Sequence, residues 1–89
     1  MSTTIARLQI HTINGKDITI TGTTVANVYR CVLSEREDSD TLGGCAWKDR
    51  VAVAEMEVSD ADSEHRYALD IRTLHDLADL ALFYLSTED

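Results

Sequence analysis

The sequence contains no proline and only two cysteines, Cys31 and Cys45, among its 89 residues. Two cysteines are too few for a disulfide-dense scaffold, so we expect both thiols to be reduced and partly buried. The longest apolar runs span a few residues, far short of the roughly 20 that a membrane helix needs. The N-terminus lacks the basic and apolar segments of a secretory signal. These absences predict a cytoplasmic protein that does not bind membranes.

Sequence motifs for catalysis, cofactors and metals are also missing. There is no glycine-rich phosphate-binding loop, and the histidines and cysteines lack the close spacing of a zinc site. Residues 38–49 have the length of a calcium-binding EF-hand loop, but Leu42 stands at a ligand position and Asp49 replaces the bidentate glutamate. We therefore expect no metal, no cofactor and no enzymatic activity. The alternative is an enzyme that uses Cys45 as its nucleophile.

Positive charge is scarce, since eight lysines and arginines face sixteen aspartates and glutamates, a formal net charge of -8. The basic residues are dispersed, which disfavours direct binding to nucleic acid. Residues 1–34 hold three cations and one carboxylate, a net of +2, whereas residues 35–64 hold ten carboxylates and three cations, a net of -7. The negative charge is therefore a property of the middle of the chain.

The first part of the chain predicts a β-hairpin followed by a helix. Polar and apolar residues alternate from Thr4 to Ile13, as in a half-buried strand. Asn14-Gly15 predicts a two-residue turn into a second strand over residues 17–21. Thr23 or Thr24 can then cap a helix.

The second part predicts the same order of elements. Hydrophobicity alternates over residues 50–58 as in a strand, although alanine, methionine and glutamate also favour a helix there. We expect a strand, paired with residues 66–71 through the acidic loop 59–64. Thr73 and Asp76 resemble a capping box at the start of a final helix.

The repeated order of strand, strand and helix predicts a single α+β domain over residues 1–89. The simplest packing is a two-layer sandwich, with a four-stranded, mainly antiparallel sheet and both helices on one face. Residues 38–44 would form a loop between the two halves. The other face of the sheet would be polar and open to solvent or a partner; it would carry Arg7, Gln9, Glu55, Glu57, Arg66 and Asp70.

The ten carboxylates of the middle of the chain are candidate partner-binding residues. Duplex DNA presents one charge per about 1.7 Å of its axis, so neighbouring carboxylates can occupy a phosphate-binding cleft on another protein. We expect a protein partner with a basic surface. The alternative is that the charges only solvate loops and strand edges. The candidate residues are Glu35, Glu37, Asp38, Asp40, Asp49, Glu55, Glu57, Asp60, Asp62 and Glu64.

In its length, acidity and compact α+β layout, the whole chain resembles the small counter-defence proteins of bacteriophages, notably the anti-CRISPR inhibitors. The resemblance implies a stoichiometric inhibitor that acts in the cytoplasm of the host cell. Its target would be a host nuclease or a CRISPR effector complex, held by acidic side chains that face lysines and arginines meant for DNA or RNA. The resemblance transfers no family residue, so the candidate carboxylates come from this sequence alone.

A different function is a homodimeric structural or assembly protein. In that case Trp47, Phe83 and Tyr84 would be exposed and would pack against a second copy, and the carboxylates would only solvate the surface. Trp47 fits the core equally well.

Overall fold

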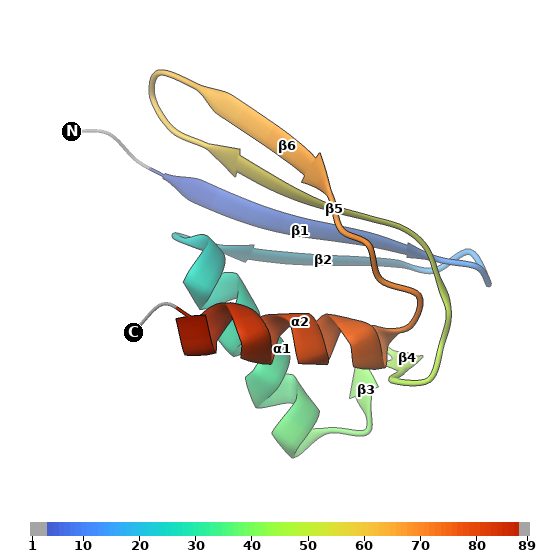
Figure 1. Cartoon of the computed structure of the whole chain (residues 1–89). Coiled ribbons are helices and arrows are strands. Elements are labelled where there is room, and N and C mark those ends of the chain that lie inside the picture. The colour runs from blue at the N-terminus through green and yellow to red at the C-terminus, as the bar shows by residue number, and fades with distance from the viewer. Residues whose placement is uncertain (1–3, 88–89) are drawn as a thin grey trace.

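The computed structural model describes residues 4–87 and shows an α+β fold with a helical layer on one face of a sheet (Figure 1). The four long strands form an antiparallel sheet in the order β2-β1-β5-β6. The predicted two-layer architecture is confirmed, and a short β3–β4 pair is added to it. The elements are β1 (Ile5–Thr12), β2 (Asp17–Gly22), α1 (Val25–Asp38), β3 (Thr41–Leu42), β4 (Cys45–Ala46), β5 (Val51–Ser59), β6 (Glu64–Ala68) and α2 (Leu74–Thr87).

The β1–β2 hairpin lies where it was predicted, but its turn is different. The Thr12 amide donates to the Lys16 carbonyl at 2.9 Å, and the Gly15 amide donates to the Thr12 carbonyl at 3.1 Å. Gly15 has a φ of 83°, whereas Asn14 does not have a positive φ. A three-residue loop with glycine in the left-handed position therefore joins the strands, and the predicted two-residue turn is wrong.

Helix α1 begins with Thr24, whose hydroxyl accepts the Asn27 amide at 3.0 Å. One face of the helix is buried and carries Ala26, Val28, Tyr29 and Val32. At the other end the Ser39 amide donates to the Glu35 carbonyl at 2.8 Å. Helix capping and an apolar stripe thus explain where this helix forms.

The capping box predicted for α2 is confirmed. The Asp76 amide donates to the Thr73 hydroxyl at 3.4 Å, and the Asp76 carboxylate accepts the Thr73 amide at 3.3 Å and the Arg72 amide at 3.0 Å. The buried face of the helix carries Leu74, Leu77, Ala78 and Ala81. Neither helix within residues 4–87 has the length and apolar character required to cross a membrane.

The segment predicted as a loop over residues 38–44 contains a tight hairpin instead. Gly43 and Gly44 have φ values of 60° and 87°, and two positive φ values are what a two-residue hairpin turn requires. A Cβ on Gly43 would meet Ile18 Cγ1 at 3.1 Å, so the hairpin lies close against β2. Trp47 follows it and is 4% exposed, with its Nε1 donating to the Ser39 carbonyl at 3.1 Å. Trp47 therefore belongs to the core, which is one of the two positions that the sequence left open.

The core lies between the sheet and the helices, and the central strands β1 and β5 and both helices contribute to it. Residues 50–58 fall largely in strand β5, as predicted, and β5 pairs with β1 through Leu8 and Met56, both 0% exposed. All five residues of β6 are exposed. Tyr84 of α2 packs on Tyr29 of α1, with 4.9 Å between ring centroids. The helices therefore cover the centre of the sheet and the β2 side more fully than the β6 side.

Candidate functional site

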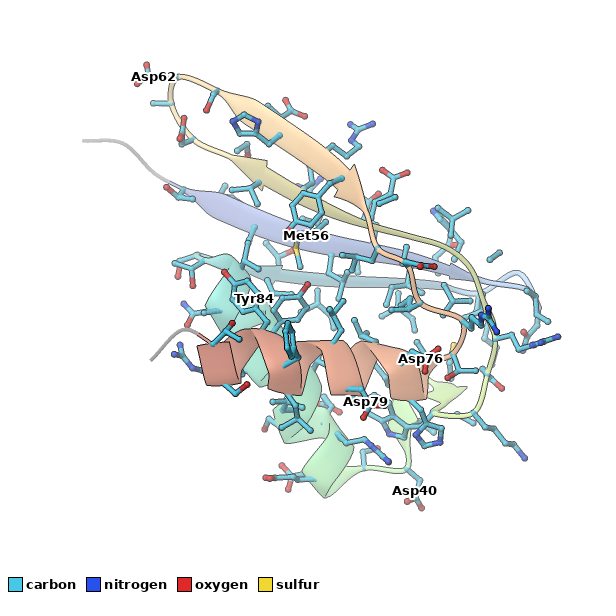
Figure 2. All side chains as sticks on the ribbon, viewed as in Figure 1. Asp40, Met56, Asp62, Asp76, Asp79 and Tyr84 are labelled. Atoms are coloured by element: carbon cyan, nitrogen blue, oxygen red, sulfur yellow. The ribbon has the colours of Figure 1, made fainter. Side chains whose placement is uncertain are left out.

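The ten candidate carboxylates do not form one surface. Asp62 lies at the free end of the β5–β6 hairpin, whereas Asp40 lies beyond the end of α1, on the far side of the helical layer (Figure 2). Asp49 lies between β4 and β5, and its carboxylate accepts the Ala46 amide at 3.1 Å. Apart from Asp49, the carboxylates divide into three groups, which differ in what they contact, and Glu64 belongs to two of them.

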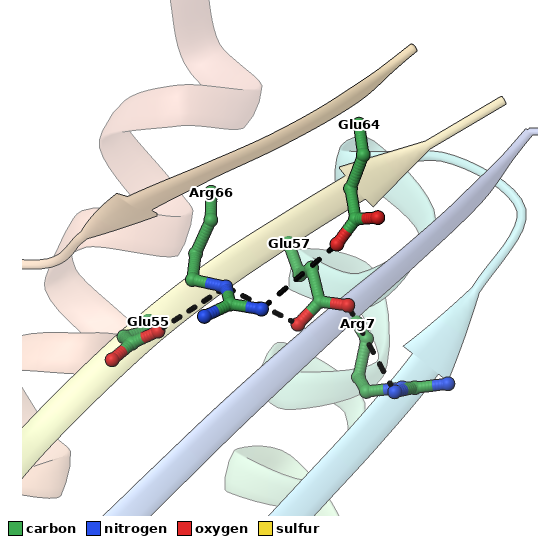
Figure 3. A network of polar contacts seen from close by, with 5 residues as sticks. All are labelled: Arg7, Glu55, Glu57, Glu64 and Arg66. Carbon is green, nitrogen blue, oxygen red and sulfur yellow. Dashed lines mark ion pairs between the residues drawn. The ribbon is translucent and has the colours of Figure 1, made fainter. Parts of the chain in front are cut away.

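The first group lies on the open sheet face, meaning the face of the sheet opposite the helices. Arg66 Nε lies 3.7 Å from Glu55 and 3.6 Å from Glu57, and the Arg66 guanidinium also lies 3.9 Å from Glu64 (Figure 3). Arg7 reaches Glu57 at 4.0 Å from the neighbouring strand. Two arginines therefore balance much of the negative charge on this face. The predicted polar face is present, but it is a mixed-charge network, and Asp70 lies outside its strands.

The second group is the hairpin tip, formed by Asp60, Asp62 and Glu64. Asp60 accepts the amides of Asp62 and Ser63, each at 2.8 Å, and thereby holds the turn between β5 and β6. These backbone hydrogen bonds, the Asp62 amide first, lower the pKa of the fully exposed Asp60 carboxyl below its usual value. Asp60 therefore has a structural role in this turn.

The third group is the acidic helix end, formed by Glu35, Glu37, Asp38 and Asp40. All four residues are exposed, and none forms an ion pair with another residue in the range 4–87. Three of them occupy the last turn of α1, where the partial negative charge of the helix terminus opposes a carboxylate. The nearby Arg36 places its guanidinium over the Trp47 ring, 5.3 Å from the centroid. This group presents uncompensated negative charge to solvent.

An apolar groove adjoins the acidic helix end. It has a volume of about 420 Å³ and lies between β2, α1 and the β3–β4 hairpin. Glu35 stands on the α1 wall one turn from the exposed thiol of Cys31. The lining residues are Ile18, Thr19, Ile20, Cys31, Glu35, Leu42 and Gly43. A carboxylate beside an apolar depression is an arrangement that protein interfaces use, with apolar contact at the centre and charge at the rim.

The two thiols differ sharply in access. Cys45, the nucleophile considered from the sequence, is 1% exposed and lies in the core, whereas Cys31 is exposed. Within residues 4–87, no three histidine, cysteine, aspartate or glutamate side chains gather closely enough to hold a metal ion. The thiol that solvent can reach is therefore that of Cys31, which lines the groove beside β2, and not that of Cys45.

The groove was missed at the level of the sequence. Its floor depends on the close approach of Gly43 to Ile18, which joins segments 25 positions apart. The adjacent glycines at 43 and 44 were the available signal, because a Gly-Gly pair readily adopts the two positive φ values of a two-residue hairpin turn. Comparison of the chain with protein-family models, with curated proteins and with solved structures finds no match.

Proposed function

We propose that the chain is a non-enzymatic protein-binding inhibitor that places the acidic helix end against a basic nucleic-acid-binding surface. The supporting observation is the contrast between the carboxylate groups. Those of the open sheet face are paired with arginines, whereas Glu35, Glu37, Asp38 and Asp40 have no cationic partner within residues 4–87. Carboxylates in the last turn of a helix oppose its dipole by about 0.3–1 kcal/mol each, so they weaken the fold and remain available to a cation outside it.

The target in this proposal is a host nuclease or a CRISPR effector complex, in keeping with the resemblance to phage counter-defence proteins. Lysines and arginines that bind phosphates in such a target would meet carboxylates instead, and nucleic acid would be excluded by competition. Attraction between opposite charges speeds association and weakens as salt is added. This inhibition requires no chemical step, and the fraction of target that is inhibited equals the fraction that has bound the chain.

The test uses a panel of purified nucleases and guide-loaded CRISPR effectors, whose DNA binding is measured by fluorescence anisotropy as the purified chain is added. We expect at least one to lose DNA binding stoichiometrically, and the loss to weaken as salt rises from about 50 to 500 mM. The variant Glu37→Lys with Asp38→Lys should require at least about tenfold more protein, since each lost contact of this kind is worth more than 1 kcal/mol.

The matched control makes the same change of charge at the hairpin tip, as Asp62→Lys with Glu64→Lys. It should inhibit as the unmodified chain does. If both double variants inhibit equally less than the unmodified chain, only net charge matters and the acidic helix end is not the contact. If every protein in the panel keeps its DNA binding in the presence of the chain, the proposed inhibitory function is refuted.

A second candidate function is homodimerisation through α2. Leu82 and Phe83 are neighbours on this helix and are 58% and 68% exposed. Trp47 no longer contributes to such an interface, and Tyr84 packs against Tyr29 within the chain. Sedimentation equilibrium tests this alternative, because a dimer held by these side chains should dissociate in the Phe83→Glu variant. A monomer mass at every concentration would remove it.

A further inference from the structure

Strand β2 is an edge of the sheet with unused backbone groups. In an antiparallel ladder, residues bond alternately to one neighbour and to the other side. Because Thr12 and Lys16 are bonded across the hairpin, the paired positions further along β2 are Ile18 and Ile20. The amides and carbonyls of Asp17, Thr19 and Thr21 therefore point away from β1. No other backbone group among residues 4–87 bonds to these outward groups.

The outward edge of β2 opens directly into the apolar groove described above. Thr19 and Ile20 line it from the strand, and Cys31 and Glu35 line it from α1. A strand added to β2 would lie about 4.8 Å away, and every second side chain would point toward the helix side. Those side chains would enter the groove, whose volume of about 420 Å³ lies within the range of about 300–1,000 Å³ found for ligand clefts.

We infer that the β2 edge and its groove bind an extended peptide segment with alternating apolar and lysine or arginine side chains on one face, which adds a fifth strand to the sheet. The backbone groups of Thr19 supply hydrogen bonds, and the groove supplies side-chain selection. Apolar side chains meet Ile20 and Leu42, and a cationic side chain meets Glu35. The segment belongs to the partner of the inhibitor proposed above, so the identity of the partner rests on that function.

Charge favours a cationic peptide over a second copy of the chain. Glu35 is the charged residue of the groove wall, and Asp38 lies one turn beyond it on the same side of α1. Two copies would each bring a formal net charge of -8 to the contact, which opposes self-association. The remaining edge strand, β6, consists of exposed residues, and its Arg66 already pairs with Glu55 and Glu57. The β2 edge, and not the β6 edge, therefore has the charge and the groove that favour binding of a cationic strand.

The experiment uses the full chain and a synthetic peptide that repeats Thr-Val-Thr-Lys three times, which places valine and lysine alternately on one face of an added strand. Amide hydrogen exchange is followed by NMR at saturating peptide. We expect exchange at Thr19 and Thr21 to slow at least tenfold, with no change at Arg66 and Ala68, the outward amides of β6. Replacing each lysine of the peptide by glutamate should weaken binding at least tenfold.

Two variants separate backbone pairing from charge. Thr19→Pro removes the outward amide without removing a bond to β1, because proline is accepted on an edge strand whose amide faces solvent. It should abolish peptide binding. Glu35→Lys leaves the edge intact and should weaken lysine-peptide binding at least tenfold while strengthening binding of the glutamate peptide. Should Thr19→Pro fail to fold, the Glu35→Lys result and the exchange pattern still decide the question.

Several outcomes would overturn the inference. Absence of protection at Thr19, or protection at β6 in its place, would exclude strand addition at β2. Protection of Thr19 that rises with protein concentration alone would identify a second copy as the occupant. Because no nuclease is present, these results are separate from the inhibition test: a chain that binds the peptide but inhibits no effector keeps the β2 site and loses the proposed function.

Discussion

The two ββα halves of the chain have the same order of elements but treat their edge strands differently. Ile18 on β2 pairs with buried Ile10 and is 4% exposed, whereas Tyr67 on β6 pairs with buried Met56 and is 44% exposed. In the first half, α1 and the β3–β4 hairpin border β2. In the second half, as far as residue 87, no such hairpin accompanies β6, which stays outside the core. The β3–β4 hairpin is therefore the element that, together with α1, forms a groove along the β2 edge.

The largest expected effect comes from truncating the two equivalent edge residues. Ile18→Ala should lower the free energy of unfolding by about 2–5 kcal/mol, because it leaves a cavity under Gly43. Tyr67→Ala should lower it by about 1 kcal/mol or less, since the side chain is already half in water. Urea denaturation of both variants measures the difference. Equal losses would show that β6 is as well packed as β2 and would remove the contrast.

Tyr29 in the first half and Tyr67 in the second should contribute differently to the loss of stability at alkaline pH. Burial, with smaller contributions from Tyr67 and Tyr84, raises the pKa of Tyr29 from 10.0 to about 12. The neutral phenol is favoured in the folded chain, so this stability is complete below pH 10 and is lost as pH rises toward 12. The loss should amount to about 2–3 kcal/mol.

The measurement is chemical denaturation at pH 9 and pH 11.5. Tyr29→Phe should remove most of the decline that the unmodified chain shows between these values. Tyr67→Phe should remove little, although partial burial also raises the pKa of Tyr67. A decline that is unaffected by Tyr29→Phe would contradict the burial of this side chain.

The ion-pair network of the open sheet face should contribute less. Arg66→Ala leaves Glu55, Glu57 and Glu64 facing one another without their shared cation, and should lower the free energy of unfolding by about 0.5–1 kcal/mol. Thermal unfolding in low and high salt checks this, since salt should shrink the difference. Arg30→Ala on α1 is the control, and it should change stability less.

The smallest expected effect lies at the acidic helix end. Glu37→Gln or Asp38→Asn should raise the free energy of unfolding by about 0.3–1 kcal/mol, because each removes a charge that opposes the helix dipole. Asp62→Asn at the hairpin tip should leave stability unchanged. If such a variant is more stable but inhibits less, the carboxylate that destabilises the fold is also the one that contacts the target. Destabilisation would instead indicate that these carboxylates support the fold.

The long strands and both helices of this fold could be predicted from local patterns, whereas the β3–β4 hairpin and the grouping of the charges could not. Alternation identified β1 and β5, and the threonine caps identified both helices, because these signals act within a few residues. The separation of Asp40 from Asp62 depends on how the hairpin and the helix pack. The pairing of Arg7 with Glu57 depends on the β1–β5 register, which joins distant segments. No local pattern of the sequence encodes those distances.

The pairing of β1 with β5 also governs how the chain reaches this fold. Thr12 and Val51, which are paired across these strands, are 39 positions apart in the chain, whereas each flanking hairpin joins close neighbours. Hairpins form in microseconds, but uniting two of them requires a long loop to close and is the slower event. A ribosome must therefore release most of the polypeptide before the middle of the sheet exists. Until then the nascent β1–β2 ribbon has two unsatisfied sides instead of one.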